Sequence, residues 1–423
     1  MKKPFYKTLD PIVFNPKTET EQALHFFNQN GYVVLKVMKK QQRQAMVADQ
    51  WRSLIQTQPL RDNFRLAHHP QYHPDIPPTN ADDATWYNYA TQAPLPAKRR
   101  REWEDGWTWH RGFGAACDPA SMHNSHVWNL RQDPHLYNFA AKRMRTSNLW
   151  VDINRQIQKL PGQGDVEFLH WDCDPHFGPI PTTEEELASE LAAESLQGKF
   201  TCNGTSIIIG PKTHTPEFRA TFRQNYGQPQ GYKVSSHNSK KPVAKFSLDI
   251  TKPDPLNLFG DAATKKYSDW CFHLTVPPGC IIHWTKRLLH GTTKVPMNAP
   301  TEYGAYIGFF PAGSRPTYKQ ISGVDELDDR IKSYTTSLPP LLWPSFDRIH
   351  FYPARFQNFP TKFITPYIQN KLLPEHPSAT KRELVSKPGI FVDHLIPLPI
   401  PNYVPPPLTP LGRRLLGIDQ YTV

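Results

Sequence analysis

Two residues with metal-binding side chains, His170 and Asp172, lie one residue apart in the segment Phe168–Phe177. Apolar and aromatic residues precede them and a proline follows, which predicts a strand that ends in a loop. Because side chains alternate between the two faces of a strand, we expect His170 and Asp172 to share a face. An imidazole beside a carboxylate provides two ligands of the 2-His-1-carboxylate site that binds Fe(II). The same spacing also suits a hydrogen-bonded pair on a half-buried strand.

The third ligand of such a site would be a distant histidine, and His290 has suitable surroundings. An apolar strand over 280–284 precedes it and Gly291 follows it, as expected of a ligand at a strand end. His170, Asp172 and His290 are therefore candidates for one metal site, although from spacing alone the hydrogen-bonded pair is the favoured interpretation of His170 and Asp172.

The elements that position these residues are predominantly strands. We predict strands over 32–37, 149–153, 166–171, 200–209, 271–276, 280–284 and 303–310. Helices are predicted over 18–30, 41–56, 182–196 and 324–337. The helix over 182–196 has Thr182 or Thr183 as its N-cap and Gly198 as its stop, and we expect it to be an insertion over the mouth of a barrel.

Three regions follow from this pattern. Residues 1–130 form an N-terminal helical and irregular region that packs on the core, and 131–320 form the β core, with a long loop over 225–268. Residues 321–423 form a C-terminal extension rich in proline and aromatic residues. We expect its first part, 338–395, to be a strap packed on the core, because free linkers are poor in aromatics. The last part, 396–423, is predicted to be a looser polyproline-like tail.

Composition limits the classes of partner. The chain has 423 residues and a formal net charge of +11, which favours a small-molecule or acidic substrate and acidic partners such as phosphates, nucleic acid, CoA-like ligands or an anionic surface. A basic surface that only keeps the protein in solution explains the charge equally simply. A basic run at 98–101 followed by tryptophans could bind nucleic acid, but a charged surface beside a packed tryptophan cluster is the favoured interpretation. The pair His123 and His126 could bind a metal, although surface histidines are the favoured interpretation here too. The sequence does not indicate the oligomeric state.

The five cysteines form no C-x-x-C pair, so neither a disulfide framework nor a zinc ribbon is expected. No apolar run is long enough to span a membrane, and residues 1–7 do not begin a secretory signal. An intracellular, cytoplasmic protein with reduced thiols is the expectation.

Four stretches resemble, in order, segments of the phytanoyl-CoA dioxygenase-like family, and they span about residues 20 to 312. The run over 23–35 resembles the family's N-terminal F…G-Y-V-V-L entry, and 159–172 resembles its K-P-G…W-H-Q-D segment. The run over 207–214 is similar to its P-G-S-H segment, and 278–291 is similar to its G-D…F…H-G segment.

This resemblance implies a double-stranded β-helix, or jelly roll, with Fe(II) in its mouth. It also implies a dioxygenase that oxidises an unactivated C–H bond while 2-oxoglutarate is decarboxylated to succinate. His170, Asp172 and His290 would then be the iron ligands. The substrate itself is not indicated.

One feature of that family is missing. Its members place an arginine about eleven residues after the distal histidine to hold the far carboxylate of 2-oxoglutarate, whereas this chain has no arginine there. Candidate replacements are spread over several predicted elements: Arg155, Lys199, Arg287, Thr292 and Tyr303. The first two are favoured, because inward-facing strand positions can point at the metal. Two other hypotheses remain open, namely a jelly roll with another metal, such as zinc, and a non-catalytic binding or structural protein.

Overall fold

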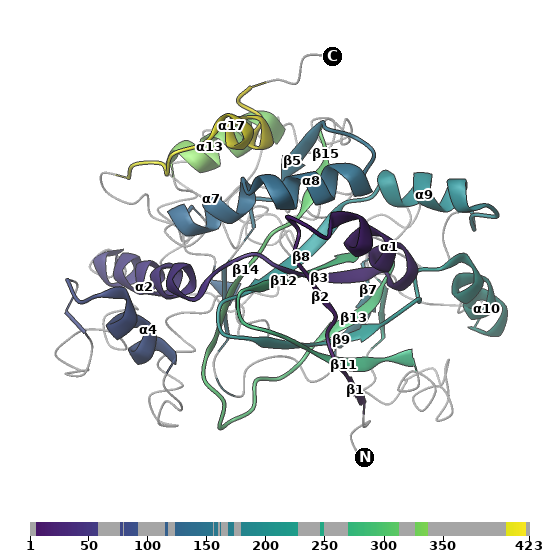
Figure 1. The fold of residues 1–423 in the computed structure, drawn as a ribbon, viewed down its shortest axis with the longest axis horizontal. Coiled ribbons are helices and arrows are strands. Elements are labelled where there is room, and N and C mark those ends of the chain that lie inside the picture. Colours follow the sequence, from purple (N-terminus) through teal and green to yellow (C-terminus); the bar gives the residue numbers. More distant parts are fainter. Residues whose placement is uncertain are drawn as a thin grey trace, which may run out of the picture.

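The structure is a computed structural model. It describes residues 6–57, 77–78, 80–91, 115–116, 123–154, 156–159, 161, 168–172, 179–226, 246–248, 270–312, 326–336 and 403–419. At 53–57, 115–116, 168–170, 225–226, 246–248 and 292 it describes the backbone alone. Two β-sheets lie at the centre, with helices around them (Figure 1).

Sheet A has, in spatial order, β1 (Lys7–Leu9), β11 (Phe272–Val276), β9 (Thr205–Gly210), β13 (Leu289–Thr292), β7 (Phe168–Trp171) and β10 (Phe246–Leu248). Sheet B has β2 (Val13–Phe14), β3 (Tyr32–Lys36), β12 (Cys280–Thr285), β8 (Leu196–Thr201), β14 (Glu302–Tyr306), β6 (Gln156–Lys159) and β4 (Ala115–Ala116). Strand β15 (Phe309–Pro311) pairs with β8 and with β5 (Leu149–Val151).

The strand order is that of a jelly roll. Taken along the chain, the strands β6, β7, β8, β9, β11, β12, β13 and β14 form the central parts of the two sheets. The first pairs with the last, β6 with β14, and the second with the second last, β7 with β13. All pairings among these strands are antiparallel. This nesting folds one long antiparallel ribbon into two facing sheets, so the predicted double-stranded β-helix is confirmed.

An apolar core fills the space between the sheets. Val34, Ile282 and Trp284 of sheet B pack with Ile207 and Ile209 of sheet A. Since alternate residues of a strand face opposite sides, this core identifies which positions of each strand face inward. Lys199, whose Cα partner is Ile282, therefore also faces the space between the sheets.

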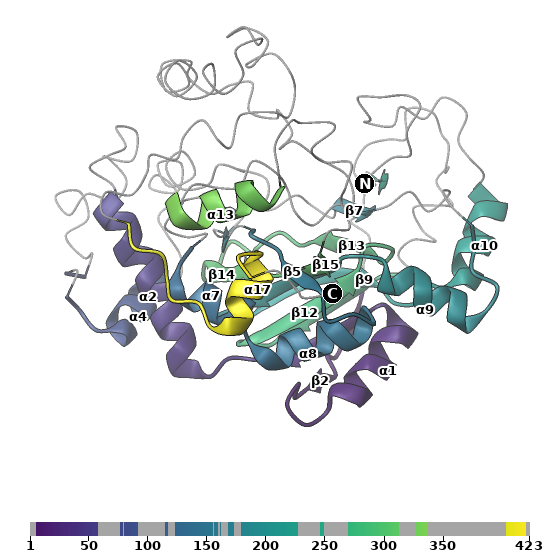
Figure 2. The same cartoon turned by 90° about the horizontal axis from the view of Figure 1, so that it is seen from above.

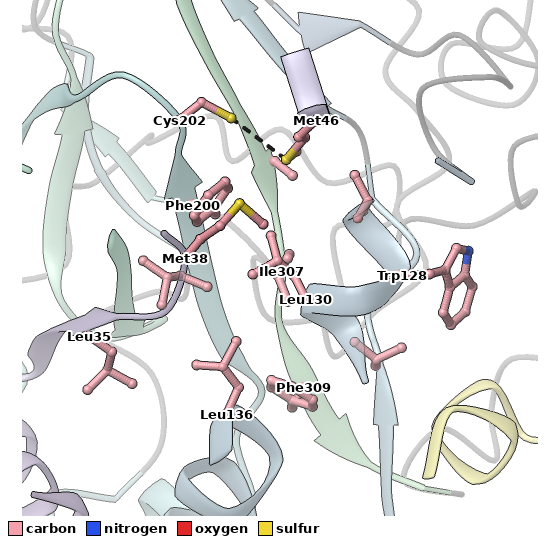
Figure 3. Close-up of a cluster of buried hydrophobic side chains, with 14 of the residues drawn as sticks. Leu35, Met38, Met46, Trp128, Leu130, Leu136, Phe200, Cys202, Ile307 and Phe309 are labelled. Carbon is pink, nitrogen blue, oxygen red and sulfur yellow. Dashed lines mark hydrogen bonds between the residues drawn. The ribbon is translucent and has the colours of Figure 1, made fainter. Parts of the chain in front are cut away.

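A second core covers the outer face of sheet B. It is built by α1 (Thr20–Asn30), α2 (Lys40–Thr57), α4 (Asp83–Thr91), α7 (Ser125–Arg131) and α8 (Pro134–Arg143) (Figure 2). In Figure 3, Met38, Leu130 and Leu136 gather around Phe200 of β8 and Phe309 of β15. The predicted helices over 18–30 and 41–56 correspond to α1 and α2. None of the described helices is both long and apolar enough to cross a membrane.

The predicted helix over 182–196 is shorter than expected. Helix α9 spans Glu184–Ala192, and Thr183 caps it by accepting a hydrogen bond from the Glu186 N–H at 3.1 Å. Gly198 does not stop this helix, because it lies inside strand β8. A Cβ at Gly198 would lie 2.4 Å from both His283 Nδ1 and the Ile307 carbonyl oxygen, so this glycine permits close packing.

The single strand predicted over 200–209 is in fact two strands. Strand β8 belongs to sheet B and β9 to sheet A, and the chain turns between them at Gly204, whose φ is +97°. That turn carries the ribbon from one sheet to the other.

The N-terminal region supplies β1, β2 and β3 to the two sheets, and β3 matches the strand predicted over 32–37. The C-terminal end differs from prediction. Residues 403–419 are not a loose tail: they include helix α17 (Pro410–Leu416), whose Leu415 and Leu416 are buried. Helix α13 (Glu326–Thr336) matches the helix predicted over 324–337. The strap predicted over 338–395 lies outside the described residues.

Candidate functional site

Strands β7 and β13 bring two of the predicted metal ligands together. Asp172 directly follows β7, and His290 lies in β13, which pairs with β7. Asp172 Oδ2 is 3.5 Å from His290 Nε2, and both side chains are almost fully buried. Position 170 is the direct Cα partner of His290 in the ladder, but the side chain of His170 lies outside the described side chains.

A backbone carbonyl fixes the orientation of the His290 ring. Nδ1 of His290 lies 2.9 Å from the Leu288 carbonyl oxygen, which can only accept, so Nδ1 carries the proton of this hydrogen bond. Nε2 is then the nitrogen presented to Asp172. Such an Nδ1–H to carbonyl bond is the usual way in which a metal-binding histidine is oriented. The ring of Trp284 packs beside it, with the ring centroids 5.2 Å apart.

The approach of Asp172 Oδ2 to His290 Nε2 suits a cation shared by the two atoms. A carboxylate oxygen and the lone pair of a neutral imidazole are both acceptors, and a proton or a metal ion between them would favour their approach in a buried site. Adjacent ligands of a first-row metal, with bonds of about 2.1 Å, lie roughly 3 Å apart. The separation of Asp172 and His290 is close to that value. Among the side chains that the structure describes, no three potential metal ligands lie together. The third predicted ligand is His170, whose side chain is not among them.

Of the predicted 2-oxoglutarate contacts, Lys199 lies in the interior. It is almost fully buried, its Nζ is 2.6 Å from Glu302 Oε1, and it donates to Thr205 Oγ1 at 2.7 Å. Lys199 stands two residues along β8 from Gln197, whose Cα partner is Trp284. At about 3.4 Å per strand residue, it lies roughly 7 Å further into the barrel than the level of Trp284.

The other four predicted contacts are placed differently. The Tyr303 hydroxyl donates to the Ala90 carbonyl and accepts from Trp51 Nε1, which places it among the helices on the outer face of sheet B. Arg287 forms ion pairs with Glu190 and Glu194. Tyr303 and Arg287 therefore do not contact the space between the two sheets through these bonds. Arg155 lies outside the described residues, and of Thr292 only the backbone in β13 is described.

Two interior residues were not predicted from the sequence, namely Lys159 and Glu302. They are direct Cα partners in β6 and β14, and both are buried. The Lys159 ammonium donates to the Thr293 carbonyl. Burial opposes ionisation of Glu302, but the ammonium groups of Lys199 and Lys159 outweigh it, so the pKa of Glu302 lies below its usual value. We call Lys159, Lys199 and Glu302 the interior lysine cluster.

Two further polar atoms lie on the inward face near His290. Trp284 Nε1 and Gln197 Oε1 are buried and have no hydrogen-bond partner among the described residues. Trp284 and Gln197 are Cα partners, and the Trp284 ring contacts the ring of His290. Buried polar groups are nearly always satisfied, so these two atoms suit a polar ligand in the interior.

The histidine pair His123 and His126 has a structural role. His123 lies between Ser333 Oγ, at 2.9 Å, and Trp128 Nε1, at 3.2 Å. His126 Nε2 is 3.0 Å from Asp49 Oδ2. Their rings therefore serve separate contacts and do not face one common point.

No protein-family model matches the chain, and no curated protein matches it in sequence. Several solved structures are similar to it. GIG2 (DUF1479) from Candida albicans is 12% identical with a TM-score of 0.42, covering 100% of this chain and 81% of GIG2. EctD from S. alaskensis is 13% identical with a TM-score of 0.36, covering 74% of this chain and 87% of EctD.

A third match is the epimerase SnoN, solved in complex with Fe3+, alpha ketoglutarate and nogalamycin RO. It is 11% identical with a TM-score of 0.35, covering 70% of this chain and 84% of SnoN. These likenesses are too distant to inform on activity, and the assignment of a jelly roll rests on the strand order described above.

Proposed function

We propose that this chain is a non-haem Fe(II) oxygenase that uses 2-oxoglutarate as cosubstrate, with His170, Asp172 and His290 as the iron ligands. The observation that carries the proposal is the buried approach of Asp172 Oδ2 to His290 Nε2, with the imidazole already oriented by Leu288. The register supports the third ligand, because position 170 is the Cα partner of His290.

The interior lysine cluster supports an acidic cosubstrate. The ammonium groups of Lys199 and Lys159 already act on one buried carboxylate, that of Glu302, and a buried ammonium group is the kind of partner that the carboxylate of a diacid requires. Along β8, Lys199 lies roughly 7 Å from the level of Trp284. This distance is comparable to the length of a short diacid. We infer that Lys199, assisted by Lys159, holds the far carboxylate in place of the absent arginine.

When bound, iron and 2-oxoglutarate would supply the oxidation of a C–H bond together with the formation of succinate. The chain supplies position and a dry site. Leu288 holds the His290 ring, and the apolar core around Ile282 and Ile209 excludes water from the space between the sheets. Trp284 Nε1 is a donor available to the bound anion.

The test combines metal analysis with product detection. Protein loaded with Fe(II) under anaerobic conditions should contain one iron and, once oxygen is admitted, form succinate from 2-oxoglutarate. Asp172→Ala and His290→Ala should each lose iron and succinate formation, whereas His25→Ala, on the exposed face of α1, should lose neither. Wild-type iron content in both ligand variants would refute the metal site.

Glu302 favours a second candidate function. Its carboxylate already contacts Lys199, the residue that would hold a diacid. This arrangement suits a metal-binding jelly roll that has lost 2-oxoglutarate use and serves as a binding or structural protein. Iron bound with normal stoichiometry, without succinate formation under any condition, would favour this candidate.

A further inference from the structure

The turn at residues 286–288, between β12 and β13, connects both described metal ligands. The Asp172 N–H donates to the Lys286 carbonyl at 3.0 Å. Nδ1 of His290 donates to the Leu288 carbonyl at 2.9 Å. A shift of this turn would therefore move Asp172 and His290 relative to each other.

One buried carboxylate, Glu194, holds this turn. Glu194 Oε2 accepts from Thr285 Oγ1 at 3.0 Å, and Oε1 accepts from Arg287 Nε. The Lys286 ammonium lies 3.8 Å from the same Oε1. Three consecutive residues thus point to one carboxylate that is almost fully buried. Burial opposes its ionisation, but Lys286, Arg287 and Arg143 outweigh this effect and keep the pKa of Glu194 below its usual value.

Further hydrogen bonds and ion pairs hold Glu194 and Arg287 in place. Arg143 donates to the Glu194 carbonyl at 2.8 Å. Arg287 Nη2 also pairs with Glu190 Oε1 at 3.0 Å, and Glu190 Oε2 pairs with the buried Arg219 at 2.7 Å. The network joins α9 and α10 (Pro216–Tyr226) to the turn, so these two helices are connected to Asp172 and His290.

We propose that Glu194 is a positioning residue for the metal site, holding the 286–288 turn so that Asp172 and His290 keep the separation that one metal ion requires. The inference rests on the proposed function, because it assumes that these two residues bind a metal. A carboxylate suits the role because the turn presents two cations and a hydroxyl to a buried point, where charge-assisted hydrogen bonds are strong. Residues that orient metal ligands typically change metal affinity 10- to 100-fold when replaced.

The central variant is Glu194→Gln, which keeps the shape of the side chain but removes its charge and replaces one accepting oxygen with a donating NH2 group. Titration of the purified full chain with Fe(II) under anaerobic conditions should show affinity weakened roughly 10-fold or more. Glu185→Gln removes a carboxylate from an exposed ion pair with Arg145 on the same helix α9 and is the control, with an expected change under about 3-fold. Thr285→Val removes the hydrogen bond to Glu194, together with a longer contact at 3.4 Å from the Arg287 N–H to Thr285 Oγ1. It should weaken binding by several fold, and it can be measured even if Glu194→Gln does not fold.

A double variant separates positioning from general stability. In Glu194→Gln with Arg287→Met, the guanidinium that faced Glu194 is removed together with the negative charge, so the melting temperature should rise towards that of the wild type while Fe(II) affinity stays low. Recovery of both together would show that Glu194 acts only through stability and would overturn the proposal, as would wild-type affinity in Glu194→Gln and Thr285→Val. If the wild-type chain itself binds no Fe(II), the proposed function fails, and the role of Glu194 fails with it.

Discussion

At the scale of single residues, a lysine buried between two sheets needs a permanent counter-charge. Lys199 has one in Glu302, which lies 2.6 Å away. Breaking a buried ion pair by removing one partner leaves the other charge uncompensated, whereas removing both charges is often tolerated. The stability of the interior and the binding of a diacid can therefore be separated by mutation.

We predict that Lys199→Met lowers the free energy of unfolding by about 3–5 kcal/mol, because it leaves Glu302 buried without this partner. Adding Glu302→Gln should restore most of that loss. Lys142→Met, in an exposed ion pair with Glu21, is the control and should cost less than about 1 kcal/mol. Urea unfolding measures all three.

The same double variant tests the role of Lys199 in binding. If Lys199 holds the far carboxylate, Lys199→Met with Glu302→Gln should be stable yet have a Michaelis constant for 2-oxoglutarate raised at least tenfold, since a charge-assisted bond is worth about 1.5–3 kcal/mol. An unchanged Michaelis constant would assign the anchor to another residue.

The sequence indicated part of this arrangement for a physical reason. The spacing of His170 and Asp172 places both on one face of a strand, whereas His290 and Lys199 became candidates chiefly through the family resemblance. Lys159 and Glu302 could not be predicted, because their meeting depends on the register between β6 and β14, which are far apart in the sequence. Tyr303 was placed in the interior by its distance from His290, yet alternation along β14 turns it to the outer face.

At the scale of elements, strand β8 shows how long-range packing can override a local signal. Gly198 has the appearance of a helix stop in the sequence, but its close neighbours are His283 and Ile307, which the local pattern does not reveal. The length of α9 was overestimated for this reason. Its start was predicted correctly, because the Thr183 cap is a local feature.

Gly198→Ala should therefore destabilise the protein by about 3 kcal/mol or more, because the added Cβ meets a buried ring and a backbone carbonyl. Gly204→Ala is the comparison: its Cβ meets nothing closer than 3.7 Å, and only its positive φ makes it costly, at roughly 1–2 kcal/mol. Equal costs in thermal unfolding would contradict the packing argument.

Helix α17 was missed although its local signals are present. Thr409 caps it by accepting from the Gly412 N–H, Pro410 is its first residue, and Gly417 ends it with a φ of +102°. The prolines before it led to the prediction of a polyproline tail. Arg330 of α13 fixes the helix by donating to the carbonyls of Leu415 and Leu416.

We predict that Leu416→Ala lowers the free energy of unfolding by about 2–5 kcal/mol, as expected for a fully buried leucine. Arg414→Ala, at an exposed position of the same helix, should cost under about 1 kcal/mol. If chemical denaturation shows no loss for Leu416→Ala, α17 does not contribute to the folded core.

At the scale of the whole molecule, two buried histidines make the free energy of unfolding depend on pH. Burial lowers the pKa of His214 and of His283 to about 4. In the unfolded chain both titrate near 6.5. Between these values the unfolded state binds more protons than the folded state, so stability falls as the pH drops from about 6.5 to about 4. Each histidine should contribute roughly 3 kcal/mol to this loss.

A neutral replacement isolates the effect. In His283→Asn, the amide nitrogen can take over the hydrogen bond to the Gln197 carbonyl, and the site no longer titrates. The decline in unfolding free energy between pH 6.5 and 4 should become shallower. His25→Asn, at an exposed position, should keep the wild-type slope. Parallel curves for the wild type and both variants would show that His283 is not the source.

The overall architecture was the easiest part to predict and the pairing the hardest. Alternating apolar residues predicted most strands. The jelly roll was predicted from the resemblance to the phytanoyl-CoA dioxygenase-like family. The pairing of β6 with β14 and of β7 with β13 builds the site. It depends on contacts across the whole core, and the alternation of apolar residues within one strand does not reveal which strand it pairs with.

The central claim is that Asp172 and His290, together with His170, bind one iron ion. X-ray absorption at the iron edge of Fe(II)-loaded protein tests it most directly. The account predicts nitrogen and oxygen ligands at roughly 2.1 Å, with the scattering pattern of two imidazoles. His290→Ala should reduce this pattern to one imidazole or abolish iron binding. A wild-type spectrum without imidazole ligands, or an unchanged spectrum in His290→Ala, would contradict the claim.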